Sequence, residues 1–159
     1  MARYLSTGYL WDKVRVEGGA YGGMALMSIS HPLFACASYR DPNVKSTVEH
    51  FMGGLNEVAA GLSQDKIDQS IIGTIGRIDT PQSPHAQGIS KTMRMLFGYT
   101  DTVRQELREA VLSADSAKLA KSANKILETA ECATVILGSA AAFDQAGKDG
   151  LILEREKLL

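Results

Sequence analysis

The residues of this sequence best suited to chemistry are an arginine and a tyrosine on either side of a glycine pair. Arg15 lies shortly before Gly18-Gly19, and Tyr21 lies shortly after them. A guanidinium is always charged and offers up to five N–H donors, whereas a tyrosine hydroxyl is a neutral donor. Such donors suit an oxygen that gains negative charge, and loss of one typically lowers the rate about 100- to 1,000-fold. Spacing alone leaves open that Arg15 is a surface ion-pair partner and Tyr21 an ordinary strand aromatic.

A helix, a glycine corner and a strand must position these two side chains. Three apolar residues at helical spacing predict the helix, namely Leu10, Trp11 and Val14. Gly18-Gly19 ends it, because glycine tolerates the positive φ of helix ends and tight turns. Residues 20–30 are small or apolar and predict a strand. We therefore expect Arg15 on the last helical turn and Tyr21 at the start of the strand, folded back toward one point.

The next residues predict a β-hairpin followed by a helix. The second strand covers residues 33–39, after a turn at His31-Pro32. Asp41 is expected to be the N-cap and Pro42 the first residue of a helix that runs to about Gly61.

Apolar spacing predicts further helices in the rest of the chain, and then one strand. The helix that opens at Ser63 and Asp65 carries a stripe of isoleucines, Ile67, Ile71, Ile75 and Ile78. Two prolines break the chain over residues 79–84. The other expected elements are helices over 85–100, 102–112 and 113–127, a buried strand over 132–138, and an Ala-rich turn with a mobile tail over 139–159. The predicted class is α+β, with an antiparallel sheet, a hairpin plus a C-terminal strand, covered by several helices.

Composition describes an ordinary globular chain that is long enough for one domain. Of its 159 residues, 45% are hydrophobic, and 17 basic against 18 acidic side chains give a net charge of −1. The charge therefore gives no indication of nucleic acid or an anionic membrane as a partner. No apolar run reaches the roughly 18 residues of a membrane span, and no signal-peptide pattern opens the chain. Cys36 and Cys132 lie in apolar runs and are expected to be reduced core residues, as in a cytoplasmic protein.

Three motifs, in the same order along the chain, resemble one family. The sequence is similar to the presequence-protease branch of the pitrilysin, or insulinase-like, zinc metallopeptidases. The matching motifs are Leu10 to Arg15 with Gly18 to Gly22, Ser38 to Asn43, and Ile78 to Pro81 with Pro84 and Gly88 behind it. The resemblance implies that residues 1–159 are a single, partial C-terminal domain of a much longer peptidase.

The resemblance also implies a role for each residue of the first motif. Arg15 and Tyr21 would contact the carbonyl of the scissile peptide and stabilise the oxyanion, as the catalytic contribution of this chain. An extended substrate would lie close to the corner residues, Gly18, Gly19, Ala20 and Gly22. Zinc and the glutamate base would lie in an N-terminal half that this sequence lacks, and the substrates would be unfolded peptides.

The sequence carries no catalytic equipment of its own. The zinc signature H-x-x-E-H is absent, and the three histidines, His31, His50 and His85, are far apart. No nucleophile elbow, P-loop or dinucleotide fingerprint occurs either. We therefore expect no metal in this chain and no activity by the chain alone. The resemblance implies the zinc-binding half as a partner, and an isolated chain is expected to pair with a second copy that covers its apolar surface. The expected location is the cytoplasm, or an organellar matrix if the protein is eukaryotic.

A second function class stays open at this point. Relatives that have lost the zinc site act as non-catalytic scaffold or interaction subunits of peptidase-like complexes. The presence of both Arg15 and Tyr21 favours the peptidase, because a scaffold has no use for an oxyanion site.

Overall fold

The computed structural model describes residues 1–28, 33–128 and 132–156. Within them, strands β1 (Gly22–Met27) and β2 (Phe34–Tyr39) form a two-stranded antiparallel sheet. The helices, in chain order, are α1 (Ala2–Thr7), the π-helix η1 (Trp11–Glu17), α2 (Lys45–Ala60), α3 (Gln64–Ile78), α4 (Pro84–Leu96), α5 (Asp101–Leu112), α6 (Ser116–Glu128) and α7 (Ala140–Lys148). The predicted α+β class is confirmed.

The first helical stretch anchors the molecule. It begins at Ala2, earlier than the motif alone indicated, and continues past Gly8 into η1. Its buried side chains are Tyr4, Leu5, Leu10 and Val14. The final turns are wider than an α-helix, because the Gly18 N–H donates to the carbonyl of Lys13, five residues back, at 3.1 Å. The predicted helix before the glycine pair is confirmed, in π-helical form.

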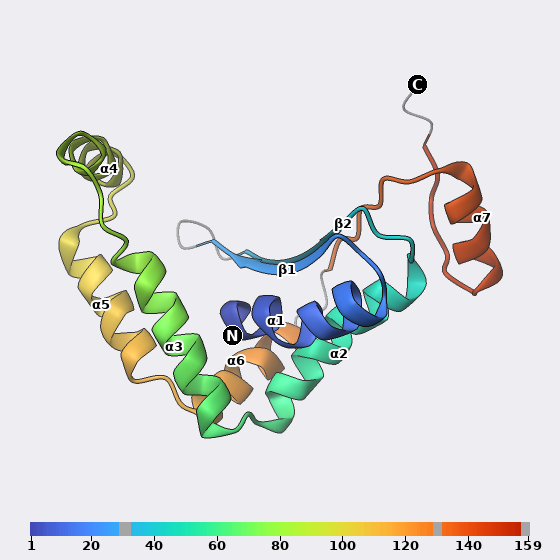
Figure 1. The fold of residues 1–159 in the computed structure, drawn as a ribbon, viewed down its shortest axis with the longest axis horizontal. Helices are drawn as coiled ribbons and strands as arrows, with labels where there is room; N and C mark the ends of the chain where they lie inside the picture. The colour runs from blue at the N-terminus through green and yellow to red at the C-terminus, as the bar shows by residue number, and fades with distance from the viewer. Residues whose placement is uncertain (29–32, 129–131, 157–159) are drawn as a thin grey trace.

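The hairpin lies across this helix (Figure 1). Gly22 pairs with Tyr39 at one end of the sheet and Met27 with Phe34 at the other. The buried strand residue Ala25 is tied to α1, because its N–H donates to the Ser6 hydroxyl at 2.9 Å and that hydroxyl donates to its carbonyl at 3.1 Å. The predicted hairpin is confirmed, while the turn expected at His31-Pro32 lies outside the described residues.

The remaining helices divide into two groups. We call α3, α4 and α5 the arm, and we call α2 and α6, together with the first helical stretch and the hairpin, the body. In Figure 1, α2 and α6 lie beneath the sheet, whereas α3 and α5 lead away to α4 at the tip. Asp79, at the end of α3, holds α5 through Arg104 at 3.2 Å and through Arg108. Neither α4 nor α5 contains a buried residue. Of the isoleucine stripe on α3, Ile67 is buried and the other members are half-buried.

Several boundaries differ from the sequence expectation, and two of these differences have a cause in the local structure. α2 begins at Lys45 and not at Pro42, because Asp41 closes a turn ahead of the helix. One oxygen of its carboxylate accepts the Asn43 N–H at 2.9 Å, and the other accepts the Thr47 hydroxyl at 2.7 Å. The helix expected over 85–100 ends at Leu96, before Gly98 with its φ of 68°.

The C-terminal strand expected over 132–138 is wrong, since these residues form neither helix nor strand. An apolar run becomes a buried strand only when another surface covers it, and among the described residues nothing covers Val135, 93% exposed, or Leu137, 85% exposed. The Ala-rich turn expected next is the helix α7. The mobility of the tail and the single partial domain over 1–159 stay predictions. No helix in the described residues is long and apolar enough to cross a membrane.

The two cysteines differ in their surroundings, which gives a first prediction. Burial, with a smaller effect from Cys132, raises the pKa of the Cys36 thiol to about 11, whereas Cys132 is exposed and not the core residue expected. Thiolate is the reactive form, so Cys36 carries about one-thousandth of its thiol as thiolate at pH 8. We expect iodoacetamide to modify Cys132 far faster, and the Cys36 rate to rise about tenfold per pH unit below pH 11. Mass spectrometry of timed samples measures both rates, with the urea-unfolded chain as the control. Equal rates in the folded chain would contradict this placement.

Candidate functional site

The glycine corner joins η1 to β1 through a short set of backbone bonds. Gly19 has a φ of 77°, a left-handed conformation that glycine adopts without strain. The N–H of Ala20 donates back to the carbonyl of Val14 at 3.1 Å. Asn43, ahead of α2, donates its side-chain amide to the carbonyl of Gly18 at 2.6 Å. The chain direction therefore reverses within a few residues, and the reversal is fixed from both sides.

This reversal brings Arg15 and Tyr21 together, as the sequence predicts. The guanidinium carbon of Arg15 lies 6.0 Å from the centre of the Tyr21 ring. The same guanidinium rests on the ring of Trp11, 4.0 Å from its centre, one helical turn away. Both predicted site residues are exposed at the surface. The catalytic role of both residues stays a prediction.

Two further residues approach Tyr21 from the opposite side. The ring of Tyr39 meets it edge-on, with centres 6.0 Å apart, and the guanidinium carbon of Arg40 lies 5.9 Å from its centre. Both belong to the second of the three motifs, and the sequence alone did not indicate either as a site residue. The hairpin register could have revealed them, because Gly22 pairs with Tyr39 and Tyr21 therefore lies beside Arg40.

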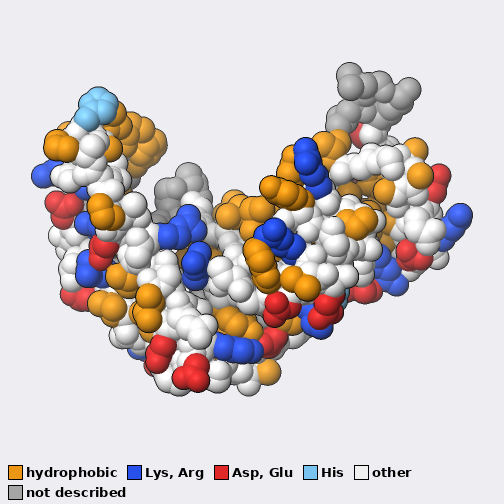
Figure 2. All heavy atoms as spheres, viewed as in Figure 1, with side chains coloured by type: hydrophobic (Ala, Val, Ile, Leu, Met, Phe, Trp, Pro, Cys, Tyr) orange, Lys and Arg blue, Asp and Glu red, His pale blue; other side chains and the backbone are white. Residues whose placement is uncertain are grey.

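These five residues form what we call the aromatic-arginine cluster, Trp11, Arg15, Tyr21, Tyr39 and Arg40. Among the described residues neither arginine has a salt-bridge partner, although Glu17 lies close in sequence. Glu17 binds Lys13 at 2.7 Å instead, and the Asp41 carboxylate is used by its turn. Figure 2 shows Lys and Arg side chains lying among hydrophobic ones in the middle of the molecule. The cluster therefore offers unused positive charge beside flat aromatic surface, a combination that suits a partly apolar anion or a polarised carbonyl.

The residues expected to touch a substrate take different positions in the corner. Gly19 is exposed, and Gly18 and Gly22 are half-buried. Ala20 is buried, with 4% of its surface exposed, so its methyl group faces the core. The substrate-binding role of all four stays a prediction.

The described residues do not bring together three side chains that could hold a metal ion. His50 packs edge-on against Tyr9, with ring centres 6.4 Å apart, and His85 is exposed at the start of α4. The third histidine, His31, lies outside the described residues. A catalytic zinc ion is therefore not supported by the donors that this part of the chain presents.

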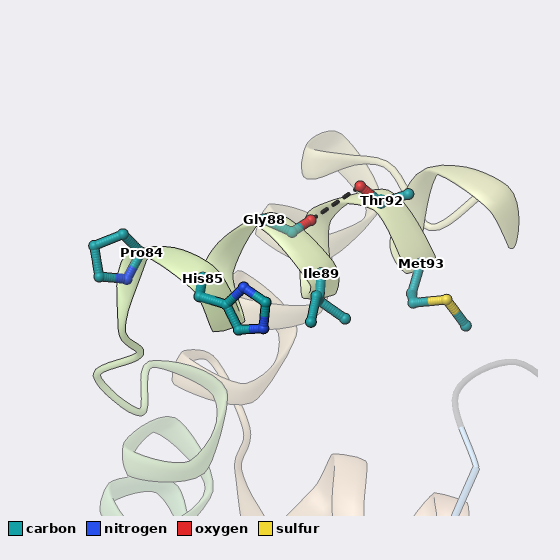
Figure 3. A pocket seen from close by; sticks show the side chains of 6 residues that line it. All are labelled: Pro84, His85, Gly88, Ile89, Thr92 and Met93. Carbon is teal, nitrogen blue, oxygen red and sulfur yellow. Dashed lines mark hydrogen bonds between the residues drawn. The ribbon is translucent and has the colours of Figure 1, made fainter.

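A shallow hollow lies far from the cluster, on α4 (Figure 3). Its lining residues all come from this one helix, Pro84, His85, Gly88, Ile89, Thr92 and Met93. His85, Ile89 and Met93 point to the same side, and the Thr92 hydroxyl donates to the carbonyl of Gly88 at 3.0 Å. A hollow on one helix face has no opposing wall to orient a substrate, so we place the candidate site at the cluster.

Comparison with known proteins decides the family. A family model described as the PreP C-terminal domain matches residues 1–139. The chain belongs to this family. It is 41% identical over 115 residues to presequence protease 1, chloroplastic/mitochondrial, of Arabidopsis thaliana, an alignment that covers 71% of this chain and 11% of that protein. The family inferred from the three motifs is thereby confirmed.

Other relatives agree. The mitochondrial presequence protease of Xenopus laevis is 32% identical over 141 residues, covering 87% of this chain and 13% of its own length. That of Saccharomyces cerevisiae is 30% identical over 142 residues, covering 87% and 14%. This PreP C-terminal domain thus spans 11–14% of these relatives. Their names place them in mitochondria or chloroplasts, and the cytoplasmic location expected for this chain stays a prediction.

The tight corner gives a second prediction. A Cβ atom added at Gly18 would lie 2.6 Å from the carbonyl oxygen of Val14, so the backbone must shift to admit it. We expect Gly18→Ala to lower the free energy of unfolding by about 1–3 kcal/mol, measured by urea titration. Gly88→Ala is the control, because nothing lies within 4 Å of its added Cβ and alanine favours the helix. Equal stability of the two variants would contradict the close approach at the corner.

Proposed function

We propose that this PreP C-terminal domain supplies the oxyanion-stabilising residues of a peptidase that degrades unfolded peptides. The observation that carries the proposal is the convergence of the Arg15 guanidinium and the Tyr21 ring, 6.0 Å apart, at an exposed corner. Among the described residues, no carboxylate binds the Arg15 guanidinium or the Tyr21 hydroxyl. Both donors therefore remain available to a bound substrate.

The two side chains have complementary tasks. Arg15 is held against Trp11, so its charge is directed without being neutralised. The Tyr21 N–H donates to the carbonyls of Tyr39 at 3.1 Å and Arg40 at 3.3 Å, which fixes the backbone that carries the ring. Donors fixed in advance stabilise developing negative charge without the cost of reorienting during the reaction. The carbonyl oxygen of the attacked peptide bond is the proposed acceptor.

The corner backbone is the proposed bed for the peptide itself. Gly18, Gly19 and Gly22 lack side chains, and Ala20 turns its methyl group inward, so an extended chain could approach without obstruction. Close approach to backbone suits an unfolded peptide and excludes a folded protein.

The zinc ion of such a peptidase would belong to another part of the polypeptide. The described residues of this chain do not supply its ligands. The N-terminal zinc-binding half is therefore the proposed partner, and this chain by itself is proposed to be inactive. When it is bound, a zinc ion would polarise the peptide carbonyl and activate a water molecule.

Reconstitution tests this proposal. The 159-residue chain is mixed with a separately produced zinc-binding half of a presequence protease, and cleavage of a quenched, unstructured peptide is followed. We expect only the mixture to cleave the peptide. Arg15→Ala or Tyr21→Phe is expected to lower kcat/KM of the mixture about 100-fold or more. Arg77→Ala and Tyr99→Phe are matched controls, because both residues lie on the arm, outside the cluster.

An active mixture that is indifferent to both cluster substitutions would overturn the oxyanion assignment. Arg15 and Tyr21 would then be structural residues, and the scaffold function would replace the peptidase function. The scaffold function would also be favoured if the two parts co-purified but the complex cleaved the peptide no faster than the zinc-binding half alone.

Self-association of the isolated chain stays a prediction. The arm exposes large apolar side chains that a second copy could cover, including Met95, Leu96 and Phe97, each more than 70% exposed. We expect the sedimentation coefficient to rise with protein concentration and to fall back in a Leu96→Gln, Phe97→Gln variant. A monomer at every concentration would contradict the prediction.

A further inference from the structure

We propose that Arg40 forms a second subsite of the aromatic-arginine cluster, which binds a carboxylate of the peptide beside the carbonyl held by Arg15 and Tyr21. The inference rests on the proposed function, since it assigns part of the specificity of the same site. The carboxylate would come either from the C-terminus of the peptide or from an acidic side chain.

The backbone of Arg40 is held in an unusual conformation. Its φ of 47° is left-handed, and it stands out as a non-glycine residue with positive φ in the described chain. This conformation is unfavourable for a residue with a Cβ atom, so the surroundings must enforce it. The Tyr21 N–H, which bonds the Arg40 carbonyl at 3.3 Å, is one contact that does so. Arg40 is therefore tied directly to the residue proposed to bind the carbonyl.

The side chain of Arg40 is directed by two rings. Its guanidinium carbon lies 5.3 Å from the centre of the Tyr39 ring and 5.9 Å from that of Tyr21. Contact with aromatic faces orients a planar guanidinium while its N–H groups stay free. A fork of parallel N–H donors matches the two oxygens of a carboxylate.

No carboxylate of the described chain occupies this fork. The adjacent Asp41 turns both oxygens away, to the Asn43 N–H and the Thr47 hydroxyl. Some other arginines of the chain do have a carboxylate partner, since Arg104 and Arg155 each bind an aspartate. An exposed arginine without a partner is common by itself, and Arg77 on α3 is one. What distinguishes Arg40 is its fixed backbone, its aromatic support and its position beside Tyr21.

The test uses the single tryptophan of the chain as its probe. Trp11 lies in the cluster, so its fluorescence reports peptides bound there. A neutral hexapeptide with a C-terminal carboxamide is compared with its free-carboxylate form and with a carboxamide form that carries one internal glutamate. We expect one or both charged forms to bind about three- to fivefold more tightly than the neutral form, the range of an exposed ion pair. The form that gains affinity identifies the source of the carboxylate.

Substitutions assign this preference to Arg40. Arg40→Gln is expected to remove it, so that charged and neutral forms bind equally, and Arg40→Asn serves as a second neutral variant that tolerates positive φ. Arg77→Gln removes the same charge from the arm and is expected to keep the full preference. Arg15→Ala is expected to weaken the neutral and charged forms alike.

Three results would overturn the subsite. These are equal binding of all forms by the unsubstituted chain, no binding of any form, or the same preference after both Arg40 substitutions. A purely structural role of Arg40 would weaken every form by one factor and leave the preference unchanged. The oxyanion role is judged separately by the cleavage assay, so the subsite can fail while the proposed function stands.

Discussion

The architecture of the site depends on the close approach of backbone at the corner after η1. The widened helix places the Val14 carbonyl where the Ala20 N–H can reach it, and Gly18 leaves the space that this contact requires. Asn43 then joins the start of α2 to the same corner. A helix, a hairpin and a second helix are thus fixed to one another at a single point, and every exposed group of the cluster is placed by that point.

In the aromatic-arginine cluster, two guanidinium groups keep their positive charge free of carboxylate partners. Elsewhere several arginines are paired with carboxylates, as Arg104 and Arg108 on α5 are with Asp79. At the corner, aromatic rings replace carboxylates as the neighbours of Arg15 and Arg40. A ring orients a guanidinium without neutralising it, whereas a carboxylate would compete with the ligand. The choice of neighbour therefore separates a binding surface from a structural one.

The sequence predicted what depends on local spacing, and it failed where neighbours decide. Helical periodicity located α2 and α3, and glycine chemistry located the corner that joins Arg15 to Tyr21. The π-helical form of η1 has no such signature, since it depends on which carbonyl Gly18 meets. Apolar composition over 132–138 was read as a strand, yet a strand requires a hydrogen-bonding neighbour that composition does not specify. The position of Arg40 beside Tyr21 was missed because it arises from the pairing register.

The arm of α3, α4 and α5 differs from the body in what holds it. Since α4 and α5 bury no residue, the free energy of opening this segment locally comes from few apolar contacts. The half-exposed pairs that Asp79 makes with Arg104 and Arg108 add to these contacts, and dissolved salt screens such pairs. Ionic strength therefore weakens the contact between α3 and α5 more than it weakens the corner, which backbone hydrogen bonds and apolar packing hold.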